Sequence, residues 1–186
     1  MALTREVVLE KADEYAAKEP LYTVEAENIE TLPQAYRTGE YGWRDAMWVV
    51  RWYYRRYLGT YPDDQRRAGE AAFGDNGFDE VQAAISKAAG ADDLDSKLKA
   101  LTSLDGVTVP VASAFLMFLD PERYIVIGER EWAILVEAGE LDTPAPKEFT
   151  VDDYATYLEA CRRRCETVDC SMWTLYRAIW RLGTQD

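Results

Sequence analysis

The chain has 186 residues, with 34 Asp and Glu against 21 Lys and Arg, no histidine, and a formal net charge of −13. A chain of this length supports one hydrophobic core, so we expect a single domain over residues 1–186. The acid excess argues against a uniformly basic surface that would hold nucleic acid without regard to sequence. The sequence has no run of about 18 apolar residues and no signal-like start, so we expect a cytoplasmic protein with no membrane partner.

Most of the basic residues are arginine, because only six of the 21 are lysine. This acidic, lysine-poor composition resembles that of proteins from salt-loving archaea, in which acidity adapts the surface to salt. On that interpretation the net charge says little about the ligand, and the places where arginines cluster become informative.

Helical periodicity dominates the sequence and predicts an all-α, compact two-lobed domain, with a period of two only in the short run "RYIVI". Residues 20–42 are expected to be looser, since Pro20 ends the first helix. Thr150 and Asp153 have the spacing of a capping box. In chain order, the predicted helices run from Thr4 to about Lys18, over 43–59, from about 76 to 89, over 95–103, 109–119 and 129–138, from Thr150 to about Val168, and over 171–182.

A tight turn, "LDGVT", separates two of these helices and makes a helix-hairpin-helix unit over about residues 95–119. The turn and the start of the second helix leave backbone N–H groups without helical partners, and the helix dipole adds partial positive charge there. An anion can therefore be held without a basic side chain. We expect the phosphate donors to be the backbone N–H groups of Gly106, Val107, Thr108 and Val109.

The stretch "LTSLDGVTVPVASAFLMF" resembles the hairpin of the helix-hairpin-helix DNA glycosylase superfamily, the endonuclease III-like base-excision repair enzymes. Asp105 and Thr108 stand where that family has a proline and its second glycine. The resemblance implies a helical fold of two lobes that binds DNA and takes a base out of the stack into a cleft. The matching positions are Leu101, Leu104, Gly106, Val107, Ala112 and Phe118.

The same resemblance implies a catalytic aspartate shortly after the hairpin and, in bifunctional members, a Schiff-base lysine in its second helix. These positions are Gly128 and Pro110 here. We therefore expect family-type catalysis to be absent. The enzyme alternative is a monofunctional DNA N-glycosylase that uses Glu129, although one residue along a helix turns a side chain by about 100°.

The segment "YGWRDAMWVVRWYYRRYLGTYPDDQRR" concentrates arginines among aromatic residues. We expect Arg51 and Arg55 to contact phosphates and Trp48 and Trp52 to stack on a base, because guanidinium groups and flat rings are what a nucleic-acid groove needs. The alternative is that the rings belong to the core and the arginines pair with carboxylates.

The three cysteines, Cys161, Cys165 and Cys170, lie within ten residues of each other. With no histidine and too few thiols for the family's four-cysteine cluster, we expect reduced structural thiols, no metal, no iron–sulfur cluster and no cofactor. A third functional possibility remains open. The net charge and Asp105 in the turn also suit a helical protein-interaction module that does not bind DNA.

Overall fold

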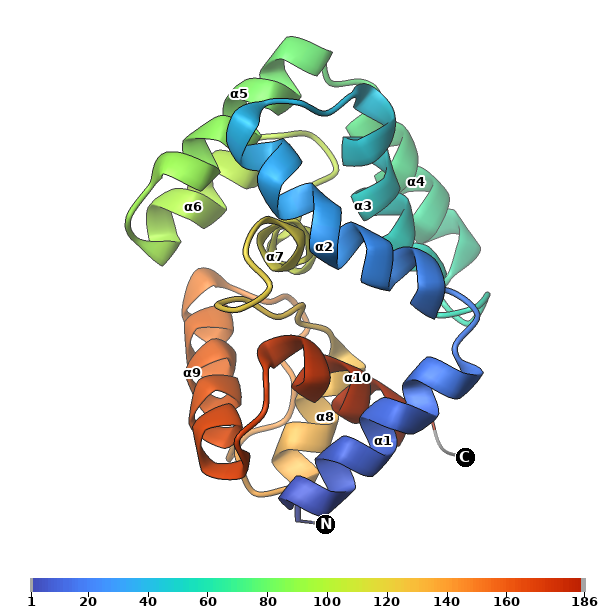
Figure 1. Ribbon diagram of the computed structural model, residues 1–186. Coiled ribbons are helices and arrows are strands. Elements are labelled where there is room, and N and C mark those ends of the chain that lie inside the picture. Colours follow the sequence, from blue (N-terminus) through green and yellow to red (C-terminus); the bar gives the residue numbers. More distant parts are fainter. Residues whose placement is uncertain (1, 185–186) are drawn as a thin grey trace.

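The computed structural model describes residues 2–184, and within this range the chain forms ten α-helices and no β-strand (Figure 1). The prediction of an all-α compact domain is confirmed. No helix in the same range is long and apolar enough to cross a membrane. The helices are α1 (Arg5–Lys18), α2 (Tyr22–Thr38), α3 (Trp43–Arg55), α4 (Asp63–Gly74), α5 (Phe78–Gly90), α6 (Leu94–Leu101), α7 (Val109–Leu119), α8 (Glu129–Glu137), α9 (Val151–Val168) and α10 (Met172–Gly183).

Side-chain caps account for several helix starts. Thr4 accepts a hydrogen bond from the Val7 N–H at 3.3 Å, which sets the beginning of α1 as predicted. Thr150 and Asp153 form the predicted capping box, with each side chain accepting from the other's backbone N–H at 3.2 and 2.8 Å. Such caps satisfy amide groups that the first turn of a helix leaves without partners.

The structure of residues 20–42 differs from the sequence prediction. We expected a looser segment, but 17 of these residues form α2, which contains Pro33 in its interior. Leu32 and Tyr36 are buried along one side, so tertiary packing outweighs the weak local signal. Gly39 ends the helix in the left-handed conformation at φ 77°.

The alternating run "RYIVI" forms no strand, although Tyr124 to Ile127 are all buried. Side chains take the place of a strand partner: the Tyr154 hydroxyl donates to the Ile125 carbonyl at 2.9 Å, and the Ile127 N–H donates to Ser113 Oγ at 3.0 Å. Buried backbone polar groups need such partners, so a single extended segment can lie in the core without a sheet.

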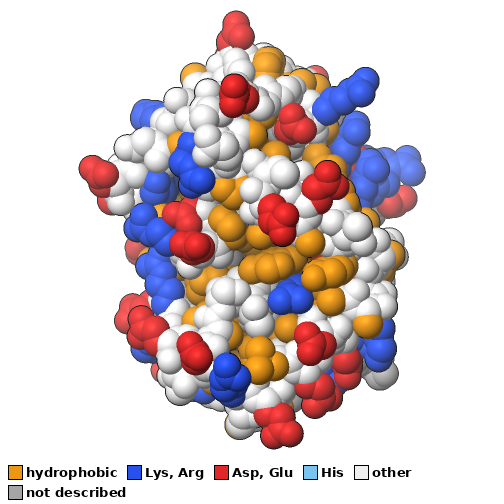
Figure 2. All heavy atoms as spheres, in the orientation of Figure 1, with side chains coloured by type: hydrophobic (Ala, Val, Ile, Leu, Met, Phe, Trp, Pro, Cys, Tyr) orange, Lys and Arg blue, Asp and Glu red, His pale blue; other side chains and the backbone are white. Residues whose placement is uncertain are grey.

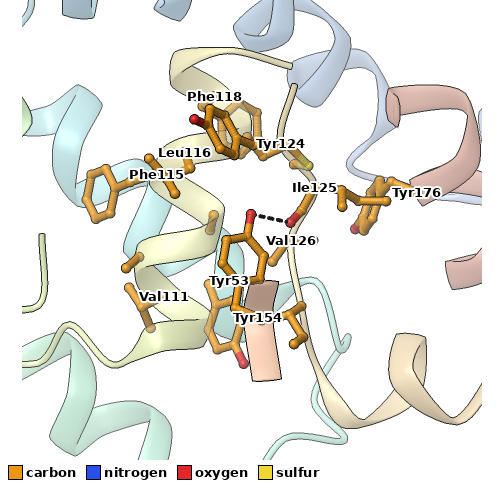
Figure 3. Close-up of a cluster of buried hydrophobic side chains, with 14 of the residues drawn as sticks. Tyr53, Val111, Phe115, Leu116, Phe118, Tyr124, Ile125, Val126, Tyr154 and Tyr176 are labelled. Carbon is orange, nitrogen blue, oxygen red and sulfur yellow. Dashed lines mark hydrogen bonds between the residues drawn. The ribbon is translucent and has the colours of Figure 1, made fainter. Parts of the chain in front are cut away.

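The helices are arranged in two groups, with α2–α6 on one side and α1, α8, α9 and α10 on the other (Figure 1). Helix α7 lies between them and packs against α2, α3, α6 and α9. Every residue from Val111 to Leu119 is buried. Figure 3 shows Ile125 and Val126 of the extended segment on one side of α7, whereas the Phe115 ring points away from that segment, on the side where it packs against Phe73.

One buried ion pair joins the two groups. Arg56, at the end of α3, bonds Glu131 of α8, and the two side chains are 1% and 0% exposed. The Arg56 guanidinium lies among five rings, with its central carbon 4.5–5.9 Å from their centroids: Trp52, Tyr53, Tyr57, Tyr176 and Trp180. Since the rings come from both α3 and α10, the charge is held where the groups meet.

Candidate functional site

The hairpin turn between α6 and α7 is fixed against α4. Gly106 has φ 75°, and a Cβ atom there would lie 2.6 Å from the backbone nitrogen of Phe73 and 2.7 Å from the carbonyl oxygen of Gly69. Only glycine meets both conditions. Asn76 adds a reciprocal bond to the turn, because its amide accepts from the Asp105 N–H and donates to the Asp105 carbonyl, both at 3.0 Å.

These contacts decide which predicted backbone donors remain available. The Val107 N–H donates to the Leu104 carbonyl at 3.2 Å, so Val107 is corrected: its donor is used within the turn. The N–H groups of Gly106, Thr108 and Val109 make no hydrogen bond with residues 2–184, and the Thr108 side chain does not cap α7. Three of the four predicted donors therefore have no hydrogen-bond partner within the described residues.

The turn opens into a cleft of about 1160 Å³. The end of α3, the α3–α4 link, the hairpin, the start of α8 and the segment 147–149 all contribute walls. Among its lining residues are Tyr54, Tyr57, Tyr61, Thr108, Val109, Pro110, Glu129, Arg130 and Lys147. Of the predicted phosphate donors, Val107, Thr108 and Val109 line this cleft, whereas Gly106 does not.

Tyrosine rings form one wall of the cleft. Tyr57 and Tyr61 are half-buried, and their ring centroids lie 5.2 Å apart. Tyr54 packs edge-on against Tyr61 at 5.1 Å. Burial raises the pKa of Tyr57 to about 12, so its hydroxyl stays neutral near neutral pH and can donate a hydrogen bond.

Arg130 places a cation in the cleft. Its guanidinium carbon lies 4.3 Å from the Trp180 ring centroid and 5.0 Å from that of Tyr57, which holds the side chain in place. No carboxylate among the described residues pairs with it, although the chain is strongly acidic. An arginine in this state is suited to a phosphate.

Glu129 also faces the cleft, as the first residue of α8, and is exposed. Burial raises the pKa of Tyr61, and the negative charge of Glu129 adds to the effect, which puts the two side chains near one another. The rotation of about 100° per helical residue predicted a poor orientation for Glu129. In the structure, Glu129 instead lines the same cleft as the hairpin.

Side-chain packing explains why position 128 is glycine. Its φ of −164° is ordinary extended backbone, but a Cβ atom would lie 2.6 Å from Glu131 Oε2, 2.9 Å from the Tyr57 hydroxyl and 3.1 Å from Arg56 Nη2. The buried ion pair therefore fills the space that a side chain at position 128 would need. Pro110 occupies the first turn of α7, where the missing N–H does no harm.

The four side chains predicted from the arginine–aromatic segment lie elsewhere, and none lines the cleft. Trp52 is only 2% exposed and donates its indole N–H to Glu25 at 2.7 Å, so its proposed stacking role is corrected to a core role. Trp48 is half-buried and packs on Phe118 at 5.1 Å. Arg51 is exposed, whereas Arg55 is bound by both oxygens of Glu70 at 3.0 and 2.9 Å.

Sequence reasoning missed the residues that line the cleft from the same segment, namely the tyrosines, and it missed Arg130. It also missed Leu58, which has φ 50° and is 57% exposed, in the link beside Tyr57 and Thr60. A left-handed, exposed leucine is uncommon, because a side chain strains that conformation. The signal available was position alone: "YLGTY" directly follows the arginine-rich helix.

Within residues 2–184, no group of three or more Cys, Asp or Glu side chains is arranged to hold a metal ion. No protein-family model, curated protein or solved structure matches this chain.

Proposed function

We propose that the protein binds duplex DNA with one nucleotide turned out of the stack into the cleft, and that it does so without family-type hydrolysis. The observation that carries the proposal is the convergence of three kinds of group on one cleft. Backbone donors of the hairpin, tyrosine rings and the unpaired Arg130 all line it. Phosphate binding and base stacking need these groups together.

The acidic surface is compatible with this interaction. Figure 2 shows acidic side chains spread over one face, with lysines and arginines mainly toward its edges. The backbone donors and Arg130 contact DNA over a small area. A small contact area limits the repulsion between the acidic surface and the DNA phosphates. The expected binding is weak, and its salt dependence corresponds to only a few phosphates.

Leu58, which lies in the chain between the cleft-lining residues Tyr57 and Thr60, supports the same proposal. Proteins that unstack a base pair insert apolar side chains between base steps. Leu58 and Leu9 are the two large hydrophobic residues that are exposed among the described residues, at 57% and 37%. Because Leu9 lies in α1, away from the cleft-lining residues, it offers a matched control.

The test uses a duplex with 2-aminopurine opposite a mismatch, titrated with protein over a series of potassium concentrations. We expect increased 2-aminopurine emission on binding and a log–log salt slope of only a few charges. Leu58→Ala should reduce the emission change several-fold, while Leu9→Ala should leave it unaltered. No binding at any salt concentration would overturn the proposal and favour the protein-interaction module.

The second candidate function is a surviving monofunctional N-glycosylase, and the cleft position of Glu129 favours it. A carboxylate beside an extruded nucleotide could stabilise positive charge on the sugar. Duplexes with uracil, oxidised or alkylated bases, treated with alkali after incubation, should show strand breaks if this activity exists. Glu129→Gln should abolish these breaks. Strands that stay intact with every lesion would rule out the N-glycosylase and leave DNA binding as the proposed function.

A further inference from the structure

Two cysteines meet at the C-terminal end of α9, outside the cleft. Cys165 lies in the last turn, and Asp169 follows the helix in the left-handed conformation at φ 53°. The Cys170 N–H donates to the Cys165 carbonyl at 3.1 Å. This is the Schellman arrangement, which brings the side chains of these two positions together. Their sulfur atoms are 3.6 Å apart.

The two thiols differ in accessibility. Cys165 is 9% exposed and touches Met172 Sδ at 3.6 Å, whereas Cys170 is half-buried and can be reached from solvent. Contact with the Cys165 thiol lowers the pKa of Cys170, although the Asp169 carboxylate opposes this. The same contact, together with burial, raises the pKa of Cys165. The accessible thiol is thus also the better nucleophile.

We propose that Cys165 and Cys170 form a disulfide-forming modification site that reacts with a small-molecule disulfide through Cys170. The Cys170 thiolate attacks one sulfur of the reagent, whose S–S bond breaks and releases one thiolate. Cys165 then loses its proton to solvent and attacks Cys170 Sγ, which expels the second thiolate. The protein gives up two electrons, and one reagent disulfide becomes two thiols.

The distance makes the second step easy, because the sulfur atoms need to approach by only about 1.5 Å to reach the length of a disulfide bond. Cys161 does not compete in the folded protein. It is one helical turn earlier, is 0% exposed, and burial raises the pKa of its thiol. Specific pairing within the folded chain is therefore expected.

The experiment incubates folded wild-type protein with oxidised glutathione, blocks the remaining thiols and digests with trypsin. Cleavage after Arg164 and Arg177 puts Cys165 and Cys170 in one peptide and Cys161 in another. We expect the 165–177 peptide to lose two hydrogens and escape blocking, while Cys161 is blocked. A link between two peptides, or three blocked cysteines, would overturn the proposal.

Variants test the order of the steps. Cys165→Ser should accumulate one glutathione on Cys170, because the resolving thiol is gone. Cys170→Ser should remain unmodified over the same time, and Cys161→Ser should form the disulfide as the wild type does. Circular dichroism confirms that each variant is folded. A faster reaction at Cys165 than at Cys170 would contradict the mechanism.

Discussion

Arg55 and Arg56 are neighbours in the chain and each pairs with a glutamate, but their surroundings are opposite. The Arg55 side chain is 51% exposed and binds Glu70 of the adjacent helix α4. Arg56 is 1% exposed and binds Glu131, 75 residues further along the chain. The 100° rotation between successive helical residues sends one guanidinium to solvent and the other to the boundary between the helix groups.

The same pair of residue types therefore contributes differently to stability in the two places. A solvent-exposed pair gains little, because water and salt screen it. A buried pair has lost its hydration, so each partner depends on the other. Burial works against the charge of Arg56, yet the Glu131 carboxylate and nearby tyrosines hold its pKa above the ordinary value.

The largest effect should follow from breaking the buried pair. Glu131→Ala leaves Arg56 charged and without a carboxylate, and we expect the free energy of unfolding to fall by about 3–5 kcal/mol. Denaturant unfolding followed by circular dichroism measures it. As a control, the double variant Arg56→Met with Glu131→Leu should lose much less. An equal loss of stability in both variants would show that the loss comes from side-chain packing and not from the unpaired charge.

Glu25, in contrast to Glu131, is a buried carboxylate without a direct cationic partner. It is 0% exposed and accepts from the Tyr15 hydroxyl and the Trp52 indole, both at 2.7 Å. Glu25→Ala leaves two buried donors unpaired and should reduce the free energy of unfolding by about 2–4 kcal/mol.

The pH dependence of Glu25 has a definite sign. Burial raises its pKa above the ordinary 4.5, so its contribution to stability is present below pH 4.5 and is lost as pH rises through the raised value. Glu25→Gln removes this dependence. The stability of the variant relative to wild type should therefore increase from pH 4.5 toward neutrality, and a difference that is flat with pH would contradict the assignment.

Arg130 extends the comparison to an arginine that has no carboxylate partner among the described residues. Arg130→Ala should weaken duplex binding roughly five- to tenfold and lower the salt slope by about one, since one phosphate contact is lost. Fluorescence anisotropy measures both. Unchanged affinity with an unchanged slope would remove Arg130 from the proposed interface.

The smallest effect belongs to Arg55. Arg55→Ala should change the free energy of unfolding by less than about 1 kcal/mol, and less still in concentrated potassium chloride, because the pair is screened. Duplex affinity should stay within about twofold, since Glu70 already binds the guanidinium. A large loss of affinity would show that Arg55 contacts DNA, as the sequence predicted.

Local patterns predicted much of the fold. The bounds of α7 and the caps at Thr4 and Thr150 follow from residue order, because helix starts depend on side chains a few residues away. Helix α4 was not predicted, and neither was helix α2. Its buried side, including Leu32 and Tyr36, gains its stability from packing against distant parts of the chain.

The cleft was predicted only in part for the same reason. The hairpin donors are a local feature, and two of the four, Thr108 and Val109, are unpaired and line the cleft. Which rings face the cleft depends on tertiary contacts. Trp52 donates to Glu25, while Tyr57 packs on Arg130 and lines the cleft together with Tyr61. Periodicity alone could not distinguish these aromatic residues.

The first and last helices of the fold lie side by side (Figure 1). Tyr15 of α1 meets Tyr176 of α10 at 5.8 Å, and Arg181 of α10 binds Glu14 at 3.3 Å. During synthesis α1 emerges well before its partner α10 is made. Helices α2–α7 can therefore pack while the chain is still growing, whereas α1 keeps its apolar side uncovered until α10 leaves the ribosome.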